Sequence, residues 1–208
     1  MLPGPGGLRP ASVSRALRRL GAPSWLVAAA LVALALAGWW LSPRPAGQQE
    51  TGQGAGVYEL SGTVVAVADG DTVTLQAAGG RRRIRLASID APESGGRDRP
   101  GQPFGRAAGR HLAQLLSGQP VRARCYERDQ YERDVCDLLL PDGASAGLRQ
   151  VEAGMAWANM QGGGRYMRDD RLPELERQAR QAGRGLWSQA GAVEPWVWRY
   201  RCWNQKEC

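Results

Sequence analysis

The sequence predicts an α+β fold, in which one N-terminal transmembrane helix precedes a five-stranded β-barrel with three helices. Three observations support this prediction. β-rich runs separated by turn residues recur between residues 58 and 140, apolar residues recur at helical spacing in three segments, and an unbroken apolar run lies near the N-terminus. The length of 208 residues suits one domain with an anchor and a tail.

The N-terminal region contains a candidate membrane span. Residues 25–41 are entirely apolar or small, which is within the roughly 17–25 residues that cross a bilayer. A basic leader, residues 1–22, precedes them, and because basic residues stay in the cytoplasm the C-terminal part is expected to be translocated. We expect an uncleaved signal anchor over residues 23–42. The alternative is a signal peptide cleaved near Ala35-Leu36-Ala37.

The rest of the chain divides by composition. Residues 43–56 are rich in Pro, Gly and Gln and are expected to form a flexible linker. Residues 57–190 are expected to form the globular domain, and residues 191–208 form a Trp-, Arg- and Cys-rich C-terminal segment. The chain carries a net charge of +7, of which residues 1–50 supply +4 and the remainder +3. The net charge is therefore weak evidence for an anionic partner. The evidence for such a partner must come from the positions of individual arginines.

Five strands are expected in the globular domain. They cover residues 58–67, 72–77, 81–88, 121–126 and 135–140. In the second and third strands Val73, Leu75, Ile84 and Leu86 alternate with polar residues, and Gly79-Gly80 between these strands indicates a hairpin turn.

Three helices are expected over residues 104–117, 146–153 and 171–182. The first shows an apolar stripe of Phe104, Ala108, Leu112, Leu115 and Leu116. Gly118, Gly154 and Gly183 follow the three helices as stop signals, and Asp169 or Asp170 is the expected N-cap of the last. Five strands and three helices in this order suit a small Greek-key barrel of the OB type.

Three polar clusters carry the candidate chemistry: residues 69–72, 85–93 and 129–133. Asp71 and Asp90 lie at the ends of strand-like runs, where neighbouring strands can bring them together. Two carboxylates with a backbone carbonyl make an oxygen-only site, which favours Ca²⁺ over Zn²⁺. Such a cation with two arginines neutralises a phosphodiester and stabilises its transition state, and Glu93 is placed to act on a water.

The order of these features resembles the staphylococcal nuclease-like family. The matching runs are Asp69-Gly70-Asp71-Thr72-Val73, Ile84-Arg85-Leu86, Ile89-Asp90-Ala91-Pro92-Glu93, Gln102-Pro103-Phe104-Gly105, Asp129 with Tyr131 and Arg133, Gly154-Met155-Ala156-Trp157, and Gly185-Leu186-Trp187. They extend over roughly residues 58–187. The resemblance implies an exported or membrane-anchored bacterial enzyme of OB fold that uses Ca²⁺ to cut DNA and RNA and leaves 3′-phosphates.

The resemblance also implies roles for individual residues. Asp71, Asp90 and the backbone carbonyl of Ala91 would hold calcium. Glu93 would be the general base or would orient the water, and Arg85 and Arg133 would grip the phosphate. Asp69 would support the calcium ligands, and Tyr131 would contact the nucleotide.

The chain departs from the family pattern at several positions. Glu132 replaces a glycine that eases a turn, and Gln130 stands where some members have a lysine. A late nucleotide-packing tyrosine has no clear match, although Met160 falls near its place and Tyr166 could substitute. These changes bear on turnover and affinity more than on the type of reaction.

All four cysteines follow the apolar run, which agrees with export. Of the three possible disulfide pairings we favour the two local ones, Cys125–Cys136 and Cys202–Cys208. A zinc site is the alternative, but the spacings do not suit one and no histidine lies near. The C-terminal segment alternates aromatics with arginines, so it could stack on bases or pack on the domain as a disulfide-closed cover.

The function predicted is calcium-dependent hydrolysis of DNA and RNA by a monomer with a single span in the bacterial inner membrane and its catalytic domain in the periplasm or outside the cell. No protein partner can be inferred. The first alternative is a non-catalytic OB-fold module that binds nucleic acid or a protein. The second is a structural envelope protein in which Glu132 has abolished activity.

Overall fold

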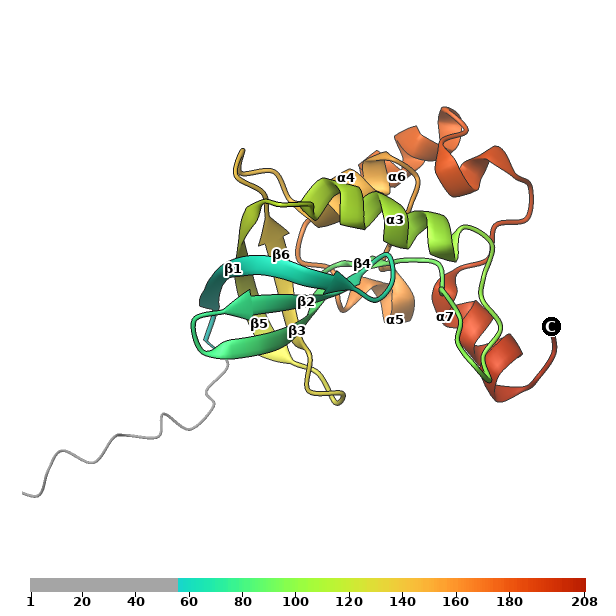
Figure 1. Cartoon of the computed structure of the whole chain (residues 1–208). Helices are drawn as coiled ribbons and strands as arrows, with labels where there is room; N and C mark the ends of the chain where they lie inside the picture. Colours follow the sequence, from blue (N-terminus) through green and yellow to red (C-terminus); the bar gives the residue numbers. More distant parts are fainter. Residues whose placement is uncertain (1–55) are drawn as a thin grey trace, which may run out of the picture. The chain divides into compact units, whose positions relative to one another are not determined.

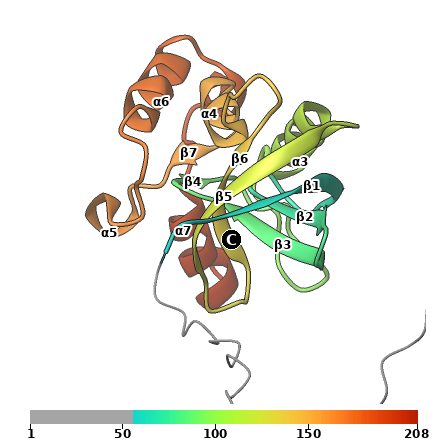
Figure 2. The ribbon, with the colours of Figure 1, turned by 90° about the vertical axis from the view of Figure 1, so that its left-hand side faces the viewer.

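The computed structural model describes residues 56–208 and contains a closed five-stranded β-barrel (Figures 1 and 2). The strands pair in the order β1-β2-β3-β6-β5, and β5 pairs with β1 to close the barrel. β3 and β6 are the only parallel neighbours within it. The strands are β1 (Tyr58–Val67), β2 (Thr72–Ala77), β3 (Gly80–Leu86), β5 (Pro120–Arg128) and β6 (Asp134–Leu139). The expected barrel is therefore confirmed.

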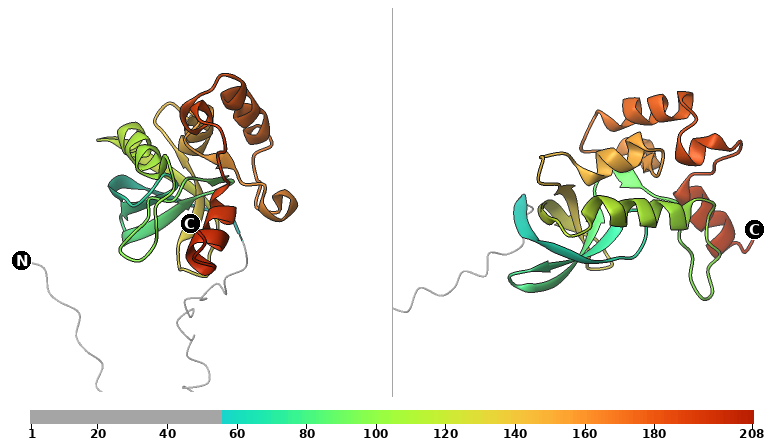
Figure 3. Two further views of the ribbon diagram at one scale, coloured as in Figure 1. Left: turned by 90° about the vertical axis from the view of Figure 1, so that its right-hand side faces the viewer. Right: turned by 45° about the horizontal axis from the view of Figure 1, so that its top comes forward.

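Helices gather on one side of the barrel (Figures 1 and 3). α3 contacts β1 and α4, and α4 in turn contacts α6 and β6. The three longer helices are α3 (Gly105–Leu116), α4 (Ala146–Glu152) and α6 (Leu172–Gln181). They correspond to the three that the sequence predicts.

Several short elements were not expected from the sequence. β4 (Ile89–Asp90) and β7 (Trp157–Ala158) form a separate two-stranded sheet. The others are α5 (Gln161–Gly164), the 3₁₀ helix η2 (Gly185–Ser188), α7 (Pro195–Trp198) and the π-helix η3 (Arg199–Asn204). Strands of two residues and single helical turns are too short to produce a periodic pattern.

The barrel core is filled by the alternating apolar positions of the strands. Val73, Leu75, Ile84 and Leu86 are all buried, as the sequence predicts. The α3 stripe closes one end with Ala108, Leu112 and Leu116. Each Val, Leu or Ile side chain buried in this way contributes about 1.5–3 kcal/mol relative to its exposed state.

β1 and β2 have the predicted bounds, the other predicted elements differ by one or two residues at one or both ends, and three of these differences have a local structural cause. β3 ends at Leu86 because Ser88 takes a positive φ of 66°, which breaks the strand. α3 starts at Gly105, since Phe104 before it has a left-handed backbone with φ 68°. The N-cap of α6 is Arg171 and not an aspartate, although the Asp169 carboxylate accepts a hydrogen bond from the backbone N–H of Arg171.

Both favoured disulfides are present. Cys125 and Cys136 are directly opposed in the β5–β6 pair and are fully buried in the barrel core. Cys202 and Cys208 close the last turn of the C-terminal segment. Both bonds lie in the part of the chain that is expected to be exported.

The predicted leader, anchor and most of the linker lie outside the described residues. Among residues 56–208, no helix has the length and apolar character needed to cross a bilayer.

Candidate active site

The β1–β2 turn, residues 68–71, brings the first carboxylates to the site. The Ala68 N–H donates to the Thr72 carbonyl, and the Asp69 carboxylate accepts from the Asp71 N–H at 3.0 Å. Gly70 is required here, since a Cβ would lie 2.6 Å from the side chains of Ala91 and Ala108. The turn is therefore packed tightly against α3 and the β4 segment, which fixes where Asp71 points.

Asp71 is buried and fully hydrogen-bonded. Its Oδ1 accepts from the Thr72 hydroxyl at 2.9 Å and pairs with Arg85, and its Oδ2 accepts from the Ala91 N–H at 2.9 Å. Burial alone would raise the pKa of Asp71, but the guanidinium of Arg85 outweighs burial and lowers it. Asp69 shows the opposite shift, because burial and the charge of Asp71 raise its pKa. Asp71 is thus ionised at neutral pH.

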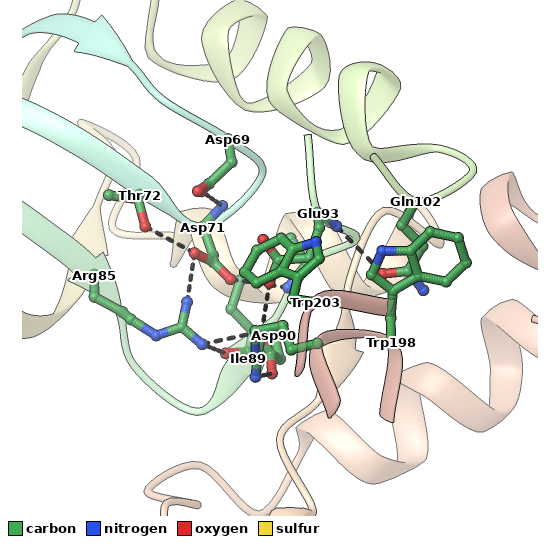
Figure 4. A network of polar contacts seen from close by, with 12 residues as sticks. Asp69, Asp71, Thr72, Arg85, Ile89, Asp90, Glu93, Gln102, Trp198 and Trp203 are labelled. Atoms are coloured by element: carbon green, nitrogen blue, oxygen red, sulfur yellow. Dashed lines mark hydrogen bonds and ion pairs between the residues drawn. The ribbon is translucent and has the colours of Figure 1, made fainter. Parts of the chain in front are cut away.

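Arg85, on β3, links the two strand ends that carry the carboxylates. Its guanidinium pairs with Asp71 and donates to Asp90 Oδ1 at 3.0 Å (Figure 4). Burial would lower the pKa of Arg85, but the charges of Asp71 and Asp90 raise it further above its ordinary value. Arg85 therefore keeps its positive charge in the centre of the cluster.

Asp90 and Glu93 follow β3 in the β4 segment and the loop after it. Asp90 is only 1% exposed, and its strand pairs with Trp157 of β7. The Gln102 N–H donates to the Glu93 carbonyl, and Gly105 lets α3 approach, since a Cβ there would lie 2.1 Å from that carbonyl. Burial raises the pKa of Glu93 and is only partly offset by Arg199. A raised carboxyl pKa suits a group that accepts a proton.

Arg133 joins the cluster from the β5–β6 connection. It pairs with Asp129 at 2.7 Å and donates from Nη1 to the Thr72 hydroxyl at 3.3 Å, and this hydroxyl in turn contacts Asp71. Tyr131 is 63% exposed, and the Arg133 guanidinium lies 5.4 Å from its ring centre. Tyr131 is thus a solvent-exposed residue next to Arg133, at the rim of the carboxylate cluster.

Glu132 occupies a left-handed backbone position with φ 59°. This is the region that a glycine adopts without strain, so a side chain here costs roughly 1–3 kcal/mol. The replacement of the family's glycine by Glu132 therefore places a side chain where the turn favours glycine. The carboxylate stays exposed on the connection.

The position expected for the missing nucleotide-packing tyrosine lies near α5, with Met160 directly before this helix and Tyr166 shortly after it. Met160 and Tyr166 are both exposed, and the Arg165 guanidinium lies 4.6 Å from the Tyr166 ring centre. In the part of the chain that the structure describes, the side-chain partners of Asp71, Asp90 and Glu93 include neither Met160 nor Tyr166. Tyr166 stays a candidate for the missing nucleotide-packing tyrosine.

The donors of the cluster fit a hard cation. Asp71, Asp90 and Glu93 are carboxylates held by shared guanidinium groups, with no nitrogen or sulfur ligand in the set. These three carboxylates carry a net charge of −1 together with Arg85 and Arg199, and of −2 together with Arg85 alone, which one divalent ion would balance. Oxygen-only sites are those that Ca²⁺ prefers.

In this structure arginines take the carboxylate oxygens. Residues 56–208 contain no group of three or more His, Cys, Asp or Glu side chains arranged as a metal site. The three residues that the family resemblance implies as calcium ligands, Asp71, Asp90 and Ala91, do lie together, since the Ala91 N–H donates to Asp71 and Arg85 pairs with both aspartates.

Sequence reasoning missed Arg199 and Gln150. Arg199 of the C-terminal segment contacts both Asp90 and Glu93. Gln150, fully buried in α4, donates to the carbonyls of Gly70 and Ala108 and so ties the β1–β2 turn to α3. The alternating Arg and aromatic residues of the C-terminal segment were a sequence signal for Arg199. Gln150 had no such signal, because it is an isolated glutamine in an expected helix.

Comparison with known proteins agrees with this geometry. The family model described as staphylococcal nuclease homologue matches residues 83–189. An Escherichia coli protein named as an uncharacterized endonuclease is 39% identical over 143 residues, covering 69% of this chain and 87% of that protein. A micrococcal nuclease of Shigella flexneri is 38% identical over 149 residues, covering 68% of this chain and 81% of that protein.

Proposed function

Because the chain belongs to the family of staphylococcal nuclease homologues and is a nuclease, we propose that it hydrolyses DNA and RNA with Ca²⁺ at the Asp71–Asp90 site. The observation that carries this proposal is the position of Arg85, which contacts Asp71 and Asp90 while Glu93 lies beside them. Three carboxylates and a buried arginine at one barrel edge form a site for a cation and a phosphate.

The chain's own residues supply most of the chemistry. Asp71, Asp90 and the Ala91 carbonyl would hold the cation, which when bound would supply positive charge to the phosphate. Glu93 takes a proton from a water as that water attacks phosphorus. The bond from phosphorus to the 5′ oxygen breaks, that oxygen takes a proton from solvent, and the product keeps a 3′-phosphate.

The two arginines act on the charge that develops during this step. A guanidinium presents a planar fork of donors that fits the oxygens of a phosphate. Arg85 approaches from β3 and Arg133 from the β5–β6 connection, so they reach the cluster from different strands. We assign both to stabilising the five-coordinate transition state, with Tyr131 at the rim contacting a base or sugar.

We further propose that the domain works outside the cytoplasm, tethered by the apolar run at residues 25–41. The two disulfides support this location, because such bonds persist in oxidising compartments. Localisation of the tagged chain by fractionation and by protease treatment of spheroplasts tests this part. Protection from protease in intact spheroplasts would contradict it.

Glu93→Gln tests the proposed reaction against the rival function of a non-catalytic binding module. The change keeps size and most hydrogen bonding but removes the charge that accepts a proton. The rate of oligonucleotide hydrolysis should fall about 10²–10⁴-fold. Binding of a non-cleavable oligonucleotide should persist, since the group acts in the transition state.

Glu59→Gln, at an exposed position on β1, is the matched control and should behave as wild type. If wild type binds oligonucleotide but hydrolyses none at saturating Ca²⁺, the binding module is the correct function. Glu132 would then be the first position to revert to glycine.

A further inference from the structure

Arg199 places a positive charge on the same carboxylates that would hold the cation and the proton. Its Nη2 donates to Asp90 Oδ2 at 2.7 Å, and its Nη1 donates to Asp90 Oδ1 at 3.1 Å and to Glu93 Oε1 at 2.6 Å. Both Asp90 oxygens and one Glu93 oxygen are therefore taken by one guanidinium. Such paired, charge-assisted contacts are the stronger hydrogen bonds in proteins.

The C-terminal segment that carries Arg199 is held onto the domain by further contacts. The indole N–H groups of Trp198 and Trp203 both donate to the Pro100 carbonyl, at 3.3 and 3.1 Å. The Arg99 guanidinium lies 4.8 Å from the Trp203 ring centre. All these partners belong to the loop that follows Glu93.

The Gln102 side-chain amide adds a contact to the carbonyl of Val193, at the start of the C-terminal segment. The segment and the loop after Glu93 therefore lie side by side (Figures 1 and 3), and Figure 4 draws both tryptophans with Asp90 and Glu93. The Cys202–Cys208 bond closes the segment on itself. The C-terminal segment is therefore held on the domain by specific contacts.

The contacts of Arg199 cannot coexist with those of a bound cation. Without Arg199 the cluster of three carboxylates and Arg85 carries a charge of −2, and with Arg199 it carries −1. A divalent ion bound to Asp90 would compete with Arg199 for the two oxygens that Arg199 holds. Occupation by Arg199 and occupation by the cation are thus alternatives.

We propose that the C-terminal segment is an intramolecular inhibitor whose Arg199 guanidinium substitutes for the cation until Ca²⁺ and nucleic acid displace it. This inference rests on the proposed function, since it concerns access to the same site. The apparent Ca²⁺ affinity is then the intrinsic affinity multiplied by the fraction of molecules in which the segment is undocked, so docking weakens Ca²⁺ binding. Any change that undocks the segment must raise that affinity.

Arg199→Gln in the full chain is the main test, with Arg201→Gln as the matched control. Arg201 lies two residues further along the same segment, is exposed, and makes no ion pair within residues 56–208. Ca²⁺ affinity is measured by calorimetry without substrate. Arg199→Gln should bind Ca²⁺ about 10-fold more tightly or better, within the roughly 5–150-fold range of typical coupling between sites. Arg201→Gln should match wild type.

Trp203→Ala separates undocking from a local change of charge. It removes the hydrogen bond to Pro100 and the ring beside Arg99 but leaves every charge in place. It should tighten Ca²⁺ binding in the same direction as Arg199→Gln. Equal Ca²⁺ affinity in wild type and Arg199→Gln overturns the proposal, as does tighter binding in Arg199→Gln alone.

A protease readout follows docking without reference to calcium or activity. Chymotrypsin cleavage after Tyr200 releases residues 201–208, which mass spectrometry detects. Wild type should be cleaved several-fold more slowly than Arg199→Gln, and added Ca²⁺ should remove the difference. Equal cleavage rates without Ca²⁺ show that the segment is not docked and overturn the proposal.

Failure of the proposed function gives a different pattern. If neither the wild type nor Arg199→Gln hydrolyses nucleic acid at saturating Ca²⁺, the calcium nuclease assignment fails whatever the protease result. If Arg199→Gln is active but its Ca²⁺ affinity and its rate at low Ca²⁺ equal those of wild type, only the inhibitory role fails. A lower rate with unchanged affinity would instead make Arg199 a substrate contact.

Discussion

Arg133→Ala is the variant whose effect on activity can be separated most cleanly from its effect on stability. The side chain is 18% exposed and pairs with Asp129 four residues earlier, and it also donates to the Thr72 hydroxyl, so its loss removes a largely buried ion pair and one hydrogen bond. Exposed pairs contribute about 0.2–1 kcal/mol and hydrogen bonds to charged groups about 1.5–3 kcal/mol, so we expect the unfolding free energy to fall by about 1–2 kcal/mol. The change lies outside the apolar core and outside the contacts of the C-terminal segment.

The expected loss of activity is far larger. Removing one donor aimed at developing charge costs about 10²–10³-fold in turnover, or roughly 2.7–4 kcal/mol. Arg133→Lys keeps the charge but not the planar fork and should fall between wild type and Arg133→Ala. Arg122→Ala, an exposed arginine on β5, is the control for a change in surface charge.

The assay is initial-rate hydrolysis of a fluorogenic oligonucleotide at saturating Ca²⁺, with urea unfolding of the same preparations. The role in the transition state is refuted if Arg133→Ala keeps activity within about threefold of wild type. It is also refuted if the loss of activity is matched by an equal loss of unfolding free energy.

Two further predictions concern stability. Asp134 is fully buried and pairs with Arg82, so Asp134→Asn should lower the urea-unfolding free energy by about 3 kcal/mol, the lower end of the cost of breaking a buried pair. Burial raises the pKa of Asp134, but the hydrogen bonds from Arg82 outweigh burial and lower this pKa. The difference in unfolding free energy between wild type and Asp134→Asn should therefore be full at neutral pH and should shrink as the pH falls below about 4. An advantage unchanged at pH 2 would contradict this. Replacing Cys125 and Cys136 together by alanine should cost about 2–3 kcal/mol from the lost loop constraint, and identical unfolding of the wild type with and without reductant would argue against it.

Local sequence patterns were sufficient to predict the barrel. β1 and β2 have the predicted bounds because period-two alternation and a clear turn residue at each end specify a strand. The end of β3 was misplaced because the left-handed Ser88 gives no composition signal, whereas a glycine would have. β4 was missed because its two residues pair with β7, which lies far away in sequence.

The candidate site, like the fold, was predicted from the sequence only in part. Asp71, Arg85, Asp90 and Glu93 converge as their strand-end positions and the family resemblance implied. Arg199 could not be placed, because its partners are 109 and 106 residues earlier in the chain and no local pattern encodes such a contact. Pairing over that distance is decided by packing of the C-terminal segment on the loop after Glu93.

The most direct test of the calcium nuclease assignment is hydrolysis of DNA and of RNA by the purified protein with Ca²⁺, with excess chelator, and after Ca²⁺ is restored. We expect cleavage of both substrates with Ca²⁺, products ending in 3′-phosphates, loss of cleavage in chelator, and recovery when Ca²⁺ returns. Asp90→Asn should stay inactive at Ca²⁺ concentrations that saturate the wild type. Cleavage that continues undiminished in excess chelator would contradict a calcium site at Asp71 and Asp90.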